Sequence, residues 1–231
     1  MSTVLDLLSA PLEPYAVRIA TRKRQRLSLA AEPEEMLYLI RKGLHLTSAP
    51  MPHDRHQVLS ILYPGDIVRA SALPPIEGAA VISASDKGEV WRVRWSAIEA
   101  LLGRDANVAR VISDRLTDQA ARSALHKSIL AGLSGDERVV ALMLEIAART
   151  GRETATGVTF EMPLSRNDIA EYMALNADTV SRIVSRLRAS GVLTPAGRNL
   201  LICPSFADLA RACPLAPAIT RLHNAGHLLP A

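Results

Sequence analysis

The chain has 231 residues, enough for one large or two small domains with a hydrophobic core. Hydrophobic residues make up 48% and charged residues 22%, without an apolar run of membrane-spanning length. The first twenty residues include Asp6 and Glu13 and lack the order of a signal peptide, so we expect a cytoplasmic protein without a membrane partner. Two cysteines are too few for a disulfide framework or a four-thiolate iron–sulfur cluster.

The charge balance is mildly basic. The chain carries 27 Lys and Arg against 23 Asp and Glu, a formal net charge of +4. This balance permits a nucleic-acid partner without requiring one, so the local placement of the charges must decide.

Short apolar runs broken by turn formers extend from about Tyr15 to Val93. Leu37–Ile40 is followed by Gly43, and Val58–Tyr63 by the sequence Pro-Gly-Asp. This alternation predicts a many-stranded antiparallel β-barrel or roll.

The periodicity then changes to that of a helix. Val108, Ile112, Leu116 and Ala120 recur at i+4, which predicts a long amphipathic helix from about Asp105 to Leu130. We interpret Val108, Ile112 and Leu116 as the seam of a homodimer. The alternative, a helix packed on its own barrel, fits the periodicity equally well.

A hinge is expected after this helix, where Gly132 and Ser134-Gly135-Asp136 precede a second amphipathic helix over Glu137–Arg149. The predicted organisation is therefore a sensor-like β-roll over residues 1–103, a dimerisation helix and hinge over 104–131, and a third part over 132–231.

The segment from Leu164 to Ile202 carries the most specific pattern. Ser165-Arg166-Asn167-Asp168 reads as a capping box that opens a short helix ending near Met173. A three-residue connection follows, and Asn176 can cap a second helix that ends near Ala189. A hairpin between Val192 and Ile202 completes the pattern of a winged helix-turn-helix.

The second helix of this pair has side chains suited to a major groove. Four residues on its first turns lie away from the apolar face and are predicted to read bases: Ala177, Asp178, Ser181 and Arg182. Five further residues are predicted to contact phosphates: Ser165, Thr179, Arg186, Arg188 and Arg198. A surface helix with merely solvated arginines is the alternative, and the ordered succession of cap, turn, polar face and wing favours double-stranded DNA as the partner.

Four stretches of the chain, two in the predicted helix-turn-helix and two in the predicted roll, resemble a known family. Leu164–Ala170 and Asp178–Leu187 are similar to the DNA-binding signature of the Crp/Fnr superfamily of transcription regulators, and Tyr38–Gly43 and Leu62–Asp66 are similar to two turns of its cyclic-nucleotide-binding-like roll. The resemblance implies an α+β fold with an antiparallel β-roll, a long dimerisation helix and a C-terminal winged helix-turn-helix. It also implies a homodimer that binds near-palindromic sites and contacts RNA polymerase.

The Fnr and FixK branches of that family carry Glu where this chain has Asp178, followed by Ser and Arg at the spacing of Ser181 and Arg182, and read half-sites of TTGAT type. The side chain of Asp is one methylene shorter than that of Glu. We therefore expect the outer bases of the half-site to differ.

The roll departs from the pattern of relatives that bind cyclic AMP. Arg69-Ala70 stands where they carry Gly-Glu, and Gly78-Ala79-Ala80 replaces Arg-Ser-Ala. The acceptor for the ribose and the guanidinium for the phosphate are both missing, although Arg69 can approach such a pocket from another wall. We therefore expect no cyclic-nucleotide dependence and no cofactor.

Three alternatives stay open at this point. Cys203 and Cys213 can make the protein a redox sensor, or the roll can hold a non-nucleotide ligand, including haem through a histidine. A cupin-like metal enzyme would use His45, His53, His56 and Glu77, but their spacing is not that of cupins, so we expect no enzyme and no metal site. The tail over residues 214–231 has no interpretation.

Overall fold

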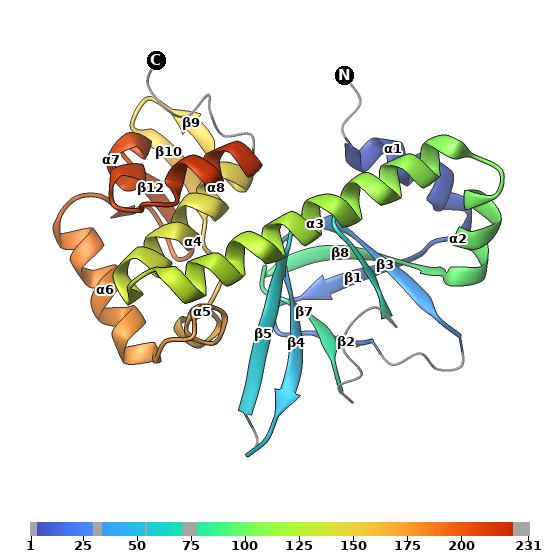
Figure 1. The fold of residues 1–231 in the computed structure, drawn as a ribbon, viewed down its shortest axis with the longest axis horizontal. Coiled ribbons are helices and arrows are strands. Elements are labelled where there is room, and N and C mark those ends of the chain that lie inside the picture. Colours follow the sequence, from blue (N-terminus) through green and yellow to red (C-terminus); the bar gives the residue numbers. More distant parts are fainter. Residues whose placement is uncertain (1–3, 30–33, 54, 71–77, 224–231) are drawn as a thin grey trace. The chain divides into compact units, whose positions relative to one another are not determined.

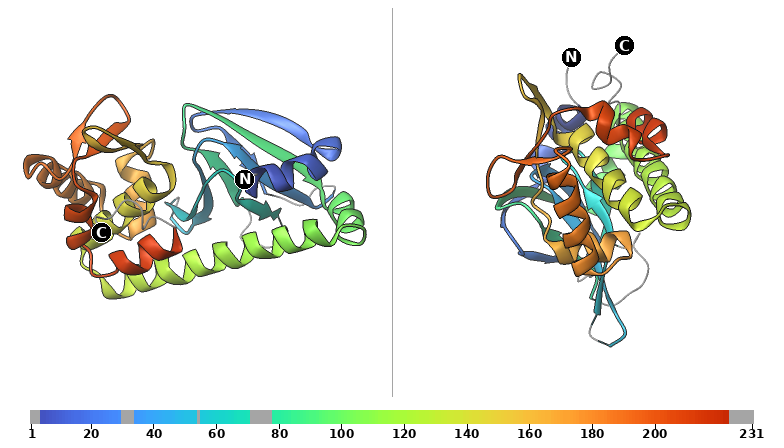
Figure 2. Two further views of the ribbon diagram at one scale, coloured as in Figure 1. Left: turned by 90° about the horizontal axis from the view of Figure 1, so that it is seen from above. Right: turned by 90° about the vertical axis from the view of Figure 1, so that its left-hand side faces the viewer.

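The computed structural model describes residues 4–29, 34–53, 55–70 and 78–223 (Figure 1). Its contacts form two compact units, Met1–Ala120 and Ala121–Ala231. The boundary falls within the longest helix, α3 (Ala106–Gly132), which runs without a break (Figure 2). A separate dimerisation segment over 104–131 stays a prediction. No helix within the described ranges is both long and apolar enough to cross a membrane.

The first unit is the expected antiparallel roll. Its strands form two four-stranded sheets, in the orders β1-β8-β3-β6 and β2-β7-β4-β5. Every pairing in them is antiparallel. The strands are β1 (Val17–Arg22), β2 (Arg26–Ser28), β3 (Met36–Lys42), β4 (His45–Met51), β5 (Arg55–Leu62), β6 (Ile67–Arg69), β7 (Ala80–Ser83) and β8 (Lys87–Arg94).

The Pro-Gly-Asp turn after β5 shows why the chain reverses there. Gly65 has a φ of +93°, a conformation that side chains other than glycine rarely adopt. The fully buried Asp66 accepts a hydrogen bond from the Tyr63 amide at 2.8 Å, and the Gly65 amide donates to the Ile40 carbonyl at 2.8 Å. These contacts join the turn to β3 and fix the direction in which β6 leaves it.

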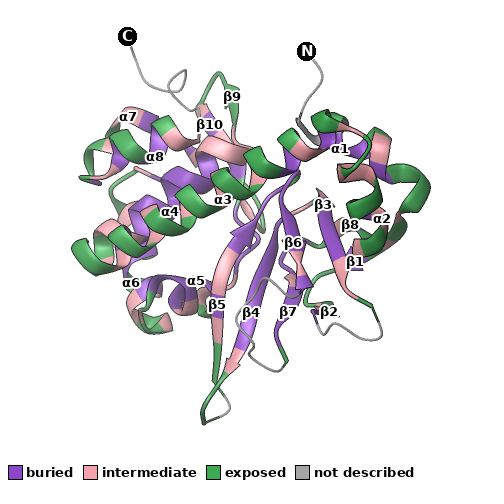
Figure 3. Ribbon diagram, turned by 45° about the vertical axis from the view of Figure 1, so that its right-hand side comes forward, coloured by how far each residue is buried: buried purple, intermediate pink, exposed green. Residues whose placement is uncertain are grey.

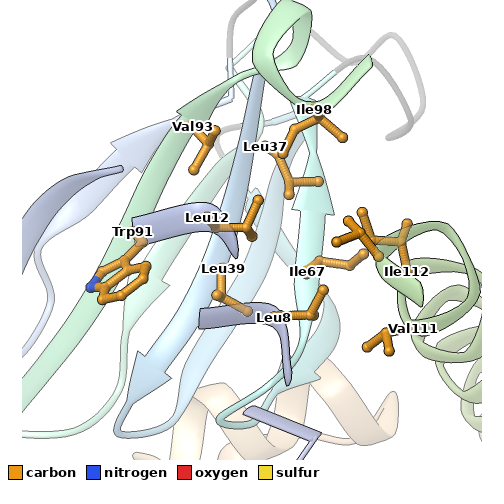
Figure 4. Packing of buried hydrophobic residues seen from close by; sticks show 11 residues of the cluster. Leu8, Leu12, Leu37, Leu39, Ile67, Trp91, Val93, Ile98, Val111 and Ile112 are labelled. Atoms are coloured by element: carbon orange, nitrogen blue, oxygen red, sulfur yellow. The ribbon is translucent and has the colours of Figure 1, made fainter. Parts of the chain in front are cut away.

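Two hydrophobic clusters stabilise the roll. One lies between the sheets and includes Tyr38, Ile40, Val81 and Val90. The other covers the outer face of the β1-β8-β3-β6 sheet, where Leu37, Leu39, Ile67, Trp91 and Val93 meet three helices (Figure 4). These helices are α1 (Val4–Leu12), α2 (Trp95–Leu102) and the first turns of α3; a 3₁₀ turn, η1 (Glu13–Tyr15), follows α1.

Part of the row of apolar residues at i+4 spacing on α3, which we call the stripe, packs against the roll of the same chain. Val108 and Ile112 are only 2% and 5% exposed and belong to the outer cluster. Figure 4 shows Ile112 and Val111, which belongs to the same cluster. Within one chain they are thus covered by the roll, which is the alternative interpretation of the stripe. Leu116 is 50% exposed and is the member of the expected seam that lies open to a partner.

Within the described residues, the second unit contains the last part of α3, five further helices and a small sheet. The helices are α4 (Gly135–Thr150), α5 (Arg166–Met173), α6 (Ala177–Ala189), α7 (Phe206–Arg211) and α8 (Ala216–Leu222). The sheet has the order β11-β12-β10-β9, with β9 (Arg152–Thr154), β10 (Gly157–Glu161), β11 (Thr194–Pro195) and β12 (Leu200–Cys203). Helix α4 is its centre, because its side chains from Val139 to Ala147 are buried.

The sheet of this unit has four strands, whereas the sequence predicted a two-stranded hairpin. Its edge strand β11 is shorter than the first strand of that predicted hairpin. Strand β10 pairs with both β9 and β12, and the sequence analysis found neither β9 nor β10. The expected strand from Val192 begins only at Thr194, because the Leu193 amide donates to the Leu187 carbonyl at 3.1 Å. Leu193 is fully buried, so the end of α6 and the start of the wing form one packed corner.

Candidate nucleic-acid interface

The first helix of the pair begins at the predicted capping box. The Ser165 hydroxyl accepts a hydrogen bond from the Asp168 amide at 3.1 Å, and the Asp168 carboxylate accepts one from the Ser165 amide at 2.7 Å. Two amides that the helix itself cannot satisfy are therefore paired. This fixes the start of α5 at Arg166.

The turn between the helices consists of the three expected residues. Ala174 takes the left-handed conformation, with φ 52° and ψ 49°, and the Leu175 amide donates to the Ala170 carbonyl at 2.9 Å. Asn176 then caps α6, since its Oδ1 accepts from the amides of Asp178 at 2.9 Å and Thr179 at 3.3 Å. Local hydrogen bonds thus set both ends of the turn.

Helix α6 has two distinct faces, as its alternating exposure shows in Figure 3. Val180, Ile183 and Val184 are buried and attach the helix to its unit. Asp178 and Arg182 are exposed, and Ser181 between them is half-buried. Residues at i, i+3 and i+4 share one face of a helix, so these three side chains lie together away from the core.

The predicted base-reading residues therefore occupy one end of α6. Ala177 is the first helical residue and is half-buried, and Arg182 donates from Nη2 to the Thr179 hydroxyl at 3.3 Å. Such a contact within the helix holds the guanidinium near the first turn while its remaining donors face solvent.

The predicted phosphate-contacting residues are distributed over three elements. Ser165 caps α5, Thr179, Arg186 and Arg188 lie on α6, and Arg198 is exposed in the turn between β11 and β12. Arg186 forms an ion pair with Asp136 of α4, and both side chains are about 60% exposed. Surface pairs of this kind are weak, so the guanidinium can exchange one anionic partner for another.

Arg166 is a basic residue of this region that the sequence analysis did not select. It is the first residue of α5 and is half-buried, and it lies close enough to Arg188 for their charges to interact. Burial, and then the charge of Arg188, lowers the pKa of the Arg166 guanidinium. The sequence feature that could have identified Arg166 as a phosphate-contacting residue is its position directly after an N-cap, because the free amides at a helix N-terminus favour a bound anion.

The two cysteines lie in a different environment from that of reactive thiols. Both are free and buried. Burial raises the pKa of Cys203 to about 11, and its thiol donates to the Ser205 carbonyl at 3.3 Å. Burial likewise raises the pKa of Cys213. The thiolate is the reactive form, so both residues are held in the less reactive state.

In the roll, Arg69 already has partners. Its guanidinium makes a two-pronged ion pair with Glu35, with distances of 2.7 and 2.8 Å, and lies 3.7 Å from the ring centre of Trp95. Ala70 is buried, and Gly78 has a φ of +85° and no side chain. Residues 71–77, including Glu77, lie outside the described residues.

The histidines considered as metal or haem ligands are not brought together. His45 is fully buried, with Nε2 3.0 Å from the Thr21 hydroxyl and Nδ1 3.3 Å from the Gly43 carbonyl. Both ring nitrogens are thus engaged, and burial lowers the pKa of His45 to about 4. His53 and His56 are exposed on the β4–β5 hairpin. Across the described ranges, no three His, Cys, Asp or Glu side chains are grouped as metal ligands.

Comparison with known proteins agrees with this geometry. A family model described as a Crp-like helix-turn-helix domain matches residues 137–212, which contain α5, the turn and α6. An anaerobic regulatory protein of Pasteurella multocida is 24% identical over 181 residues, 78% of this chain and 66% of that protein. The transcriptional activator protein FnrL of Cereibacter sphaeroides is 26% identical over 171 residues, 72% of this chain and 68% of FnrL.

A solved structure extends the likeness over both units. FixK2 from Bradyrhizobium japonicum superimposes with a TM-score of 0.73 at 25% identity, covering 86% of this chain and 97% of FixK2. The α+β fold, the helix-turn-helix and the relatives therefore agree. Residues 137–212 thus form a Crp-like helix-turn-helix domain, and the chain is similar to DNA-binding transcription regulators of the Crp/Fnr type.

Proposed function

We propose that the protein acts as a homodimer that places α6 of each protomer in successive major grooves of a near-palindromic promoter site. The observation that carries this proposal is the polar face of α6, where Asp178, Ser181 and Arg182 project from a helix anchored by the turn and by its buried face. Helix-turn-helix dimers bind half-sites about one helical turn apart. Such a regulator would work in the cytoplasm together with RNA polymerase, as family resemblance suggests.

The base-reading roles follow from the donor and acceptor groups. Arg182 can donate two parallel hydrogen bonds to O6 and N7 of a guanine, and Asp178 can accept from N4 of a cytosine. Ser181 suits either kind of base edge, and Ala177 offers a methyl contact to thymine. Because the Asp178 side chain is short, it reads a base only where the first turn of α6 comes close to the groove floor.

The phosphate-contacting roles follow from exposure and charge. Ser165 and Thr179 offer hydroxyl donors, and Arg186, Arg188 and Arg198 offer exposed guanidinium groups. We add Arg166 to this set, because it is half-buried next to the cap of α5 and its charge interacts with that of Arg188. A phosphate bound near both arginines would offset the repulsion between their charges.

The proposed dimer uses the part of α3 that the roll leaves exposed. Ser113, Leu116 and Ala120 recur at i+3 and i+4, and all three are exposed. One large apolar side chain flanked by small ones lets two helices approach closely. Val108 and Ile112 then support the seam from behind, by fixing α3 on the roll.

We further propose that regulation does not depend on a cyclic nucleotide. Arg69 is paired with Glu35 and covers Trp95, and neither Ala70 nor Gly78 offers a group for a ribose or a phosphate. At these described positions a cyclic nucleotide would find no partner for its charged phosphate, and an unpaired charge of this kind costs on the order of several kcal/mol.

Genomic footprinting of bound sites tests the proposed function, followed by titration of the purified protein against the recovered duplex. We expect a near-palindromic site and a specific complex that forms equally well with and without cyclic AMP. Recovery of scattered, unrelated sequences would contradict sequence-specific binding. Calorimetric detection of micromolar cyclic AMP binding would contradict the proposed independence.

A further inference from the structure

Strand β6 lies at the edge of the sheet β1-β8-β3-β6, with β3 on one side. Among the described residues, no strand pairs with its other side. The Ile40 amide of β3 donates to the Asp66 carbonyl at 2.9 Å, and successive peptide groups along a strand point to opposite edges. The amide and carbonyl of the next residue, Ile67, therefore point away from β3 and need a partner from outside the sheet.

Helix α3 offers that partner through the side chain of Gln119. Its carboxamide accepts a hydrogen bond from the Ile67 amide at 3.2 Å and donates one to the Ile67 carbonyl at 2.9 Å. A neighbouring strand would satisfy these two backbone groups with the same kinds of donor and acceptor. Gln119 is half-buried, so water competes less for both bonds. The side chain thus closes the edge of β6 at Ile67.

Gln119 lies on the face of α3 that the roll covers. It follows Ile112 by seven residues, about two helical turns, so the two side chains project in nearly the same direction. Ile112 and Ile67 belong to the same outer cluster, and Figure 4 shows both side chains in it. Both residues of α3 therefore lie against the same short strand, one through apolar packing and the other through hydrogen bonds.

These two kinds of contact differ in how they restrict the helix. Apolar packing is not directional, so Val108 and Ile112 hold α3 on the roll but fix its rotation about its own axis less closely. Two hydrogen bonds to one residue of a strand are directional. Leu116 and Ala120 of the proposed seam lie within one turn of Gln119, and both are exposed. The rotation that Gln119 fixes therefore sets the direction in which the seam faces.

We propose that Gln119 is a positioning residue of the dimer: by binding the open edge of β6, it holds α3 in the rotation that presents Leu116 and Ala120 to the second protomer. This inference rests on the proposed function, because the second protomer is part of it. A seam that is already oriented loses less freedom on association, so the contact at β6 strengthens the dimer without touching the partner.

Two substitutions test the role of the carboxamide. Gln119→Met keeps a side chain of similar length without either hydrogen bond. Gln119→Glu keeps the shape and an acceptor, but at neutral pH it sets a carboxylate oxygen against the Ile67 carbonyl. The matched control is Asn107→Met, which removes an exposed carboxamide from the first turn of the same helix.

Hydrogen exchange at the Ile67 amide measures the contact, and sedimentation equilibrium measures the dimer dissociation constant. The Val68 amide is the internal reference, because Val68 is paired with Tyr38 of β3. In Gln119→Met we expect the Ile67 amide to exchange about tenfold faster and the Val68 amide to stay unchanged. Both Gln119 variants should raise the dissociation constant about tenfold, as the loss of one or two hydrogen bonds implies, and the control should match wild type.

An unchanged dissociation constant in both Gln119 variants would overturn the inference. So would unchanged exchange of the Ile67 amide in Gln119→Met, because Gln119 would then not be its partner. Faster exchange at both Ile67 and Val68 would overturn it as well, since the strand as a whole would be destabilised. A wild type that stays monomeric at micromolar concentration would instead refute the proposed homodimer.

Discussion

In the roll, polar side chains near the expected ligand positions have partners inside the fold, whereas on α6 the polar side chains project outward. Arg69 is held by Glu35, and His45 lies between Thr21 and Gly43. Asp178 and Arg182 are exposed on their helix. Arg69 and His45 thus have their partners within the roll itself. The exposed groups of α6 gain their partners only from another molecule.

Burying a charge in the stripe of α3 should have the largest effect. Ile112→Asp places a carboxylate in the apolar cluster of the roll, so we expect it to lower the free energy of unfolding by about 3 kcal/mol or more. Urea denaturation measures this loss. Leu116→Asp, on the exposed side, should cost less than about 0.5 kcal/mol of stability and should raise the dimer dissociation constant instead.

The opposite outcome, in which Ile112→Asp affects dimerisation and Leu116→Asp affects stability, would contradict the assignment of Ile112 to the packed roll and of Leu116 to the exposed seam. If Ile112→Asp stays as stable as wild type while sedimentation shows a monomer, the stripe faces a partner and not the roll. Equilibrium sedimentation at micromolar concentration therefore accompanies both denaturation curves.

Acidification should destabilise both units through one buried and one half-buried histidine. Burial lowers the pKa of His45 in the roll and of His126 in α3 to about 4, below the ordinary value of 6.5. The unfolded chain then binds protons more readily than the folded one between pH 6.5 and 4. The stability that each neutral histidine contributes is therefore fully present above pH 6.5 and is lost as the pH falls to about 4. The loss is up to roughly 3 kcal/mol for the buried His45 and smaller for the half-buried His126, because solvent screens its charge.

The two histidines can be separated by substitution. His126 is stacked on Tyr172 of α5, with ring centres 3.9 Å apart, so its protonation should loosen the helix-turn-helix unit. His126→Gln should flatten the pH dependence of that unit's unfolding, and His45→Gln that of the roll. His53→Gln, exposed on the hairpin, is the control and should leave both profiles unchanged. A flat wild-type profile between pH 4 and 6.5 would contradict the prediction.

Substitutions of exposed arginines in the second unit should have two different effects on DNA binding, one on sequence discrimination and one on overall affinity. Arg182→Ala should cost roughly 1–3 kcal/mol in binding and relax the preference at one base pair per half-site. Arg198→Ala should weaken binding to all sequences alike and lower the salt slope by about one. Titration against consensus and single-base variants at two salt concentrations distinguishes these effects. Full discrimination retained by Arg182→Ala would show that α6 does not read bases.

The smallest expected effect concerns the turn before α6. Ala174 occupies the left-handed region, which glycine adopts without strain. Ala174→Gly should therefore raise the stability of the second unit by up to about 1 kcal/mol. Ala189→Gly, at the end of α6, serves as the control and should lower it by about 0.5–1 kcal/mol. A loss of stability in both variants would mean that the turn is not strained.

The helix pair was predictable because its signals are local. The capping box at Ser165, the cap at Asn176 and the apolar spacing of Val180, Ile183 and Leu187 act within a few residues, and α5 and α6 have the predicted bounds within one residue. The strands of the roll were predictable for the same reason, because turn-forming residues such as Gly65 separate the short apolar runs that form the strands. In both cases the deciding contacts lie close together in the sequence.

Other features were decided by contacts between distant parts of the chain. The partner of Arg69 is Glu35, 34 residues earlier, and the charges of Arg166 and Arg188 interact because the turn folds α6 against α5. Strand β10 joins the wing through β12, about forty residues away. The stripe of α3 is equally suited to a partner helix or to the roll, because periodicity records which side chains are apolar and not which surface covers them. Only the folded arrangement of α1, α2 and the sheet shows that the roll of the same chain covers Val108 and Ile112, and the dimer seam stays a prediction.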